Sequence, residues 1–66
     1  MRLLRRLVDF SLALIAQSDI SPEEARRMVQ AIRHKAVELF PDKEAAFDLI
    51  YVPRFRRLIA EKFELQ

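Results

Sequence analysis

The first seventeen residues carry apolar side chains at helical spacing, and these side chains cover a wide part of the helix circumference. At 100° per residue they fall on one arc of about 200°, opposite a polar side that includes Arg2 and Asp9. We therefore predict a helix over about residues 2–17 with more apolar surface than one neighbouring helix can cover. The apolar arc consists of Leu3, Leu4, Leu7, Val8, Phe10, Leu12, Leu14 and Ile15.

The start of a second helix is the sharpest local signal in the chain. Ser21 can cap this helix, Pro22 suits its first position, and Glu24 completes a capping box. The helix should end near Phe40, because the residue before Pro41 is driven away from helical backbone angles. Its inward side spans about 120°, as expected for a helix lying on a core. The residues on that side are Ala25, Met28, Val29, Ile32, Ala36, Leu39 and Phe40.

The last third of the chain contains two apolar stripes that do not share one phase. Asp42 can cap a helix that starts near Lys43, and a further segment begins at Pro53. In one straight α-helix the two stripes would lie about 120° apart, so they could not face the same core. We therefore predict that Pro53 starts a new helix or kinks the existing one sharply. The first stripe is Ala46, Phe47, Ile50 and Tyr51, and the second is Phe55, Leu58, Ile59 and Phe63.

Length and composition narrow the fold class. The 66 residues have room for one domain, residues 1–66, and contain no Gly, which disfavours tight β-hairpins and phosphate-binding loops. There is no Cys and only one His, so neither a disulfide nor a zinc site can hold so small a fold together. We expect an all-α bundle of three to four helices. Because 52% of the residues are hydrophobic, we expect the bundle to be oligomeric or docked on a larger partner.

The N-terminal stretch imitates a signal peptide but differs from one in detail. Asp9 interrupts its apolar run, no small-x-small cleavage site follows, and the run is far shorter than the roughly 18–20 residues that span a bilayer. The absence of Cys fits a reducing compartment. We therefore expect a cytoplasmic protein, and we do not expect attachment to a membrane.

Few residues are suited to catalysis. His34 lies on the polar side of the second helix one turn before Glu38, where a solvated ion pair is the ordinary interpretation. Ser11 is expected to bond back to the carbonyl one turn earlier instead of acting as a nucleophile. No acidic pair is spaced to share a proton or a metal, and no nucleotide, haem or zinc motif is present. We expect no enzymatic activity, no cofactor and no metal.

Arginines crowd the starts of the first and last predicted helices, where the helix dipole disfavours positive charge. One hypothesis is that these arginines bind an anionic partner, because guanidinium groups at a helix start suit phosphate or carboxylate. The alternative is antiparallel packing of these two helices, which would pair the arginines of one with an acidic end carrying Glu61 and Glu64. The candidate anion-binding residues are Arg5, Arg6, Arg54, Arg56 and Arg57.

The function that we expect is protein–protein interaction, as a homo-oligomer or as a small accessory subunit of a larger complex. The expectation rests on the wide apolar arc of the first helix and on the aromatic residues that cluster around Phe55. The expected interface residues are Leu3, Leu4, Leu7, Phe10, Leu14 and Phe55.

The alternative function is a small helical nucleic-acid-binding regulator. Arg26 and Arg33 share a side of the second helix with Gln30, which could read base edges. The low net charge of +2 counts against this alternative, as do the acidic residues on the same helix.

Overall fold

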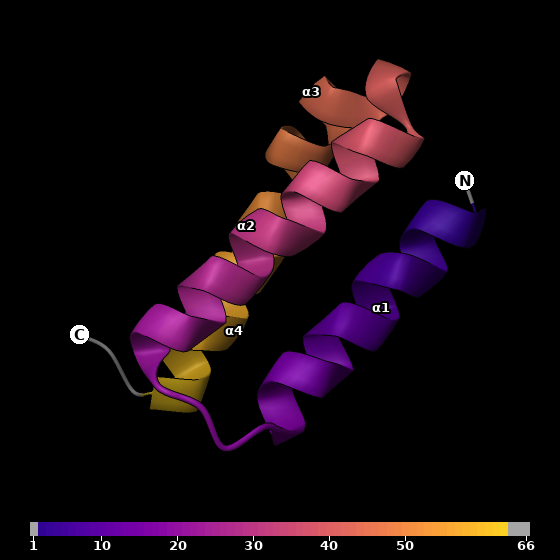
Figure 1. Cartoon of the computed structure of the whole chain (residues 1–66). Coiled ribbons are helices and arrows are strands. Elements are labelled where there is room, and N and C mark those ends of the chain that lie inside the picture. Colours follow the sequence, from indigo (N-terminus) through magenta and orange to yellow (C-terminus); the bar gives the residue numbers. More distant parts are fainter. Residues whose placement is uncertain (1, 64–66) are drawn as a thin grey trace.

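The first two helices form an antiparallel pair, and a third helical rod returns beside both of them (Figure 1). Helix α1 (Arg2–Gln17) is joined to helix α2 (Pro22–Leu39) by the short connection 18–21. The structure is a computed structural model that describes residues 2–63, and all the regular elements within this range are helical, which confirms the predicted all-α bundle. The third rod consists of η1 (Pro41–Lys43), α3 (Glu44–Ala46), the π-helical turn η2 (Phe47–Tyr51) and α4 (Val52–Phe63).

The local signals at the ends of α2 are present as predicted. The Glu24 amide donates to Ser21 Oγ at 3.1 Å, and the Ser21 amide donates to Glu24 Oε1 at 3.3 Å, which completes the capping box. At the other end, the Phe40 amide donates to the carbonyl of Ala36 at 2.8 Å before the chain turns at Pro41. Together these contacts satisfy backbone groups that a helix leaves open at its termini.

A π-helical turn brings the two apolar stripes of the third rod into line. Residues 44–63 are helical without a gap, and the Val52 amide donates to the Phe47 carbonyl five residues earlier. This wider turn changes the phase of the residues that follow it. As a result Phe47 and Phe55 stack, with their ring centroids 6.3 Å apart. The same turn moves Ile50 outward, where it is 54% exposed, so the prediction that Ile50 faces the core is wrong.

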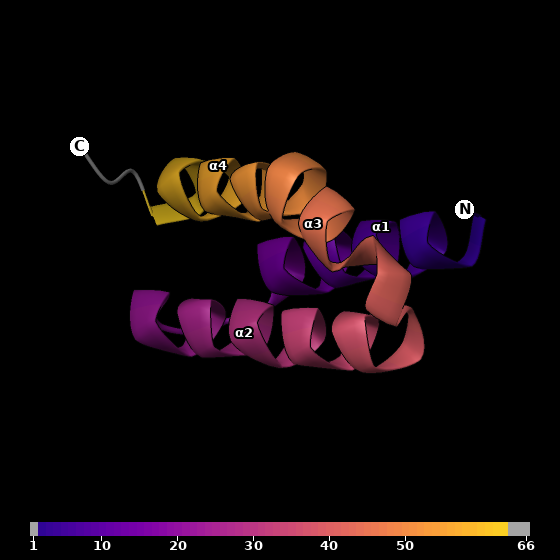
Figure 2. The same cartoon turned by 90° about the horizontal axis from the view of Figure 1, so that it is seen from above.

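The core lies where the three rods meet. In Figure 2, α1 lies at a height between α2 and α4. All three rods contribute buried residues to the core. Two of the expected interface residues, Leu4 and Phe55, are buried in this core, and they have no surface left to offer to a partner. The buried apolar residues are Leu4, Val8, Ile15, Ala25, Val29, Ala36, Phe47, Phe55 and Ile59.

Helices α1 and α4 run parallel, because the chain reverses direction twice between them, once before α2 and once after it (Figure 1). Near the end of α4, Lys62 Nζ donates to the carbonyls of Ala16 at 3.0 Å and Ser18 at 2.8 Å, at the end of α1. The antiparallel packing that would bring an arginine-rich helix start beside the acidic end of α4 is therefore absent, and that alternative is wrong. Glu64, which belonged to it, lies outside the described residues.

The burial of Phe55 predicts a large effect of its removal. Phe55→Ala should cost about 3–5 kcal/mol through lost transfer energy and a cavity. A chain of this length has a total stability of about 3–10 kcal/mol, so the variant should lose most of its cooperative unfolding transition. Urea unfolding followed by circular dichroism measures this. Leu49→Ala is the matched control, because Leu49 is exposed and its loss should change stability by less than about 0.5 kcal/mol. Equal effects of the two substitutions would contradict this account of the core.

Candidate interaction surface

Helix α1 carries two apolar stripes, each with residues spaced alternately four and three apart. The inner stripe is buried: Leu4, Val8, Ser11 and Ile15, with the Ser11 hydroxyl donating to the Leu7 carbonyl at 2.7 Å as predicted. The outer stripe is displaced by one residue, or about 100° around the helix. It consists of Leu3, Leu7, Phe10 and Leu14. Alternating spacing of this kind is typical of a seam between packed helices.

The outer stripe remains on the surface of the chain. Leu3 and Phe10 are each 68% exposed and Leu14 is 45% exposed, whereas Leu7 is half-buried. Four of the six expected interface residues therefore form one line along α1. The inner stripe supplies the fully buried residues of α1, and Leu7 of the outer stripe also packs against the core. Leu3, Phe10 and Leu14 are left exposed.

Contacts on the other side of α1 show that the outer stripe faces toward α2. Asp9 Oδ1 lies 3.8 Å from Arg54 Nη2, and Leu12 lines a shallow hollow with Leu58 of α4. Positions 9 and 12 share the side of α1 that looks toward α4. Going around α1 from the side that faces α4, the inner stripe comes first and the outer stripe second. The outer stripe therefore lies along the border between α1 and α2.

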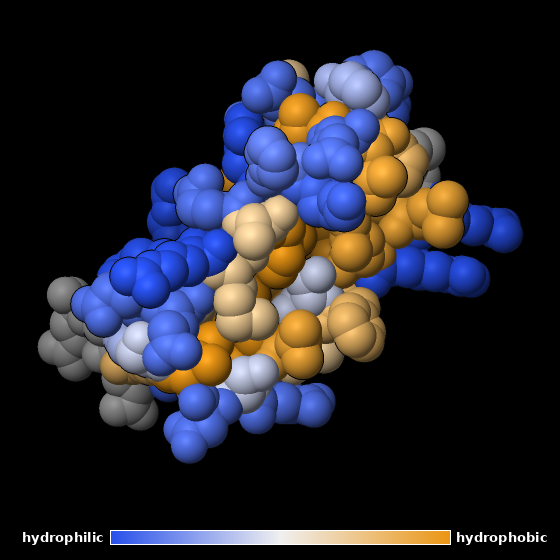
Figure 3. All heavy atoms as spheres, viewed as in Figure 1, coloured by the Kyte–Doolittle hydropathy of each residue, from blue (hydrophilic) through white to orange (hydrophobic). Residues whose placement is uncertain are grey.

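Helix α2 extends the same apolar surface. Arg26 and Gln30 border a cleft against α4, so the opposite side of α2, with Met28, Ile32 and Leu39, borders α1. Leu39 is 56% exposed, and the other two are half-buried. Figure 3 shows the resulting apolar band between α2 and α1. We call this set the helical-pair face: Leu3, Leu7, Phe10, Leu14, Met28, Ile32 and Leu39.

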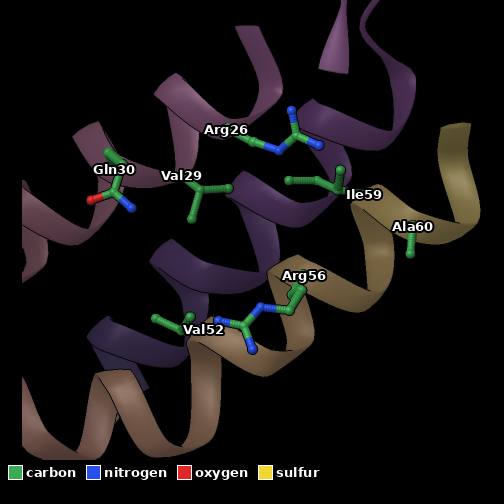
Figure 4. A pocket seen from close by; sticks show the side chains of 7 residues that line it. All are labelled: Arg26, Val29, Gln30, Val52, Arg56, Ile59 and Ala60. Carbon is green, nitrogen blue, oxygen red and sulfur yellow. The ribbon is translucent and has the colours of Figure 1, made fainter. Parts of the chain in front are cut away.

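A separate cleft of about 290 Å³ lies between α2 and α4 (Figure 4). Its wall is apolar, and Arg26 and Arg56 reach it from opposite helices, with Gln30 beside them. Within residues 2–63 neither arginine has an ion-pair partner, so the guanidinium of each is available to an anion that enters the cleft. The volume of the cleft is near the lower end of the range of about 300–1,000 Å³ that is usual for ligand pockets. The apolar residues of the wall are Val29, Val52, Ile59 and Ala60.

The five candidate anion-binding arginines do not form one site. Arg56 faces the cleft against α2, whereas Arg54 and Arg57 line the shallow hollow against α1 together with Glu61. Arg5 and Arg6 are exposed on α1. The structure thus divides these residues among three places, and only Arg56 is joined by a second arginine across a cleft.

Arg33 forms the most extensive ion pairing in the described part of the chain. Its guanidinium donates to both carboxylate oxygens of Asp48, at 2.6 and 2.8 Å, and to Glu44 at 3.0 Å. These hydrogen bonds lower the pKa of Asp48 and raise the pKa of Arg33. The cluster ties α2 to the π-helical turn. Sequence analysis missed it, although Glu44 and Asp48, one turn apart, could have indicated a shared cation.

His34 is exposed, with Nε2 3.9 Å from Glu38 Oε2, which is the pair expected from the sequence. Among residues 2–63, no cluster of His, Cys, Asp and Glu is arranged to hold a metal ion. No helix in the same range has the length and hydropathy needed to cross a bilayer. Comparisons with protein-family models, curated proteins and solved structures found no match to this chain.

The Arg33 cluster predicts a specific response to acid. A carboxylate whose pKa is lowered in the folded state stabilises the fold above its unfolded pKa of about 3.9, and this contribution is lost as pH falls through the folded pKa. Asp48→Asn should therefore lower the Tm at pH 7 and reduce the fall in Tm between about pH 5 and 2. Thermal unfolding at a series of pH values measures both effects.

Asp19→Asn is the matched control, because within residues 2–63 Asp19 has no ion-pair partner. It should keep the acid dependence of the unchanged protein. If Asp48→Asn and Asp19→Asn gave the same pH profile, the ion pair with Arg33 would have no measurable effect on stability.

Proposed function

We propose that this chain is a non-enzymatic protein–protein interaction module that docks through the helical-pair face. The partner is either another copy or a larger complex that takes the chain as an accessory subunit. The observation that carries the proposal is the outer stripe of α1, which has the spacing of a helix–helix seam and yet is exposed at Leu3, Phe10 and Leu14.

The arrangement of the exposed residues supports the proposal more than their number does. Single apolar residues are common on protein surfaces, whereas contiguous apolar patches mark interaction sites. The helical-pair face is contiguous across two helices (Figure 3). Each square ångström of apolar surface that a partner removes from water contributes about 25 cal/mol, so a partner that covers this face gains from every exposed position along it.

The nucleic-acid alternative has less support from the contacts of α2. Of the residues that suggested it, Arg33 is engaged by two carboxylates, and Arg26 and Gln30, although exposed, border the cleft against α4. A recognition helix needs such side chains free to enter a groove.

A cytoplasmic location is part of the proposal and rests on the absence of Cys. Anion binding by the cleft arginines stays a separate prediction.

A photo-reactive phenylalanine analogue placed at position 10 tests the proposal in the native host. Phe10 lies in the outer stripe and is largely exposed, so a docked partner should be within covalent reach. We expect a discrete cross-linked species on irradiation, resolved by gel electrophoresis and identified by mass spectrometry. The same analogue at position 49 is the control, because Leu49 is exposed but lies on η2, outside the face.

The pattern of adducts decides the outcome. Cross-linking at position 10 and not at position 49 supports docking through the helical-pair face. No adduct at position 10, or the same adducts at both positions, would overturn the proposal.

A further inference from the structure

The helical-pair face has a layout of charges that selects one kind of partner. We infer that the partner is a second copy of this chain, related by a two-fold axis perpendicular to the helices, with α1 antiparallel to α1 of the other copy and α2 antiparallel to α2. The inference rests on the proposed function, because it names the partner of the same face.

A second copy suits the shape of this face. Two helices side by side present a flat, two-rod layer, and two such layers stacked face to face make a four-helix arrangement with every outer stripe covered. A two-fold contact uses the same patch on both subunits, so one apolar face is sufficient for both sides. The spacing of Leu3, Leu7, Phe10 and Leu14 matches itself when the helix is reversed, because it reads four, three, four in both directions.

Two orientations bring the face against itself with the helices aligned. If the axis runs along the helices, α1 lies on α2 of the other copy and like ends of the pair meet. If the axis is perpendicular to the helices, each helix lies antiparallel on its own counterpart, and opposite ends meet. Both orientations bury the same apolar residues, so charged residues at the rim must choose between them.

The rim of the face is basic at one end and acidic at the other. Arg6 borders the outer stripe near the start of α1, and Lys35 borders the face near the end of α2, which is the same end of the pair (Figure 1). Lys35 Nζ also lies 3.4 Å from Glu38 Oε1, which neutralises part of this end. At the other end the rim carries Glu24, whose Oε1 accepts from the Ser21 amide.

These charges favour the perpendicular axis. With the axis along the helices, Lys35 would face Arg6 of the other copy, so basic groups would meet. With the perpendicular axis, Lys35 lies beside Glu24 of the other copy, and the contact occurs twice by symmetry. Coulomb attraction in the second case and repulsion in the first therefore select the antiparallel dimer.

The positions along the two helices agree with a single axis. The midpoint between Glu24 and Lys35 falls at residues 29–30 of α2, and the midpoint of the outer stripe falls at residues 8–9 of α1. Because the connection 18–21 closes the pair, these two midpoints lie roughly opposite each other. Ala31, exposed near the axis, leaves room for the backbones of the two copies to approach.

A charge reversal at Lys35 has opposite effects in the two orientations, which makes it the decisive variant. Sedimentation equilibrium of the whole chain should give a monomer–dimer equilibrium, and Lys35→Glu should weaken the dimer roughly tenfold by placing two acids together. Adding Glu24→Gln to Lys35→Glu should recover most of the affinity, since Gln at this position keeps the capping box. Arg57→Glu makes the same change in charge on α4, away from the face, and should leave the dimer unchanged.

The other outcomes count against the inference. A tighter dimer with Lys35→Glu, or an unchanged one, overturns the perpendicular axis. A chain that stays monomeric at high micromolar concentration, while position 10 still cross-links to a different protein in the host, overturns self-association but leaves the proposed function standing. Monomer together with no adduct at position 10 overturns both.

Discussion

The position of the third rod depends on one π-helical turn. Without it, Phe47 and Phe55, eight residues apart, would lie about 80° apart around the rod and would not be in line for stacking. The turn costs regular α-helical hydrogen bonds, and its last residue is Tyr51, with Val52 as the cap directly before Pro53. Proline has no amide hydrogen, so the backbone there had already lost one α-helical donor. Sequence and packing therefore place the irregular turn where the helix is weakest.

The rest of the bundle follows from the rod that this turn aligns. Phe47 and Phe55 are among the largest fully buried side chains, and the inner stripe of α1 packs in the same core. Arg33 fastens the turn to α2 through Asp48 and Glu44. These contacts bury the inner stripe of α1. The outer stripe lies about 100° further around the helix, so most of it stays at the surface.

Much of the fold could be predicted from the sequence because its signals are local. The capping box at Ser21, the end of α2 before Pro41 and the wide apolar arc of α1 each depend on residues within a few turns. The phase problem near Pro53 was also visible in the sequence. Its solution was not, because a π-helical turn and a new helix satisfy the same pattern, and only packing distinguishes them.

The candidate site was predictable in part for the same reason. Periodicity places Leu3, Leu4, Leu7, Phe10 and Leu14 on one arc, but it cannot say which part of a 200° arc the core will use. Tertiary packing buries Leu4 in the core, leaves Leu7 half-buried against it, and leaves Leu3, Phe10 and Leu14 exposed. The parallel direction of α1 and α4 could not be predicted from local signals either. Because the two helices are parallel, the arginines at their starts are not paired by acidic helix ends.

The contact between Lys62 and the end of α1 has a consequence for how α1 is closed. The last carbonyls of a helix need donors, and without any glycine the chain has no residue that easily adopts the left-handed turn that usually supplies them. Here the side chain of Lys62, near the end of α4, donates to Ala16 and Ser18 instead. The end of α1 therefore receives these donors only when α4 is docked beside it, which couples the folding of two helices that lie far apart in the sequence.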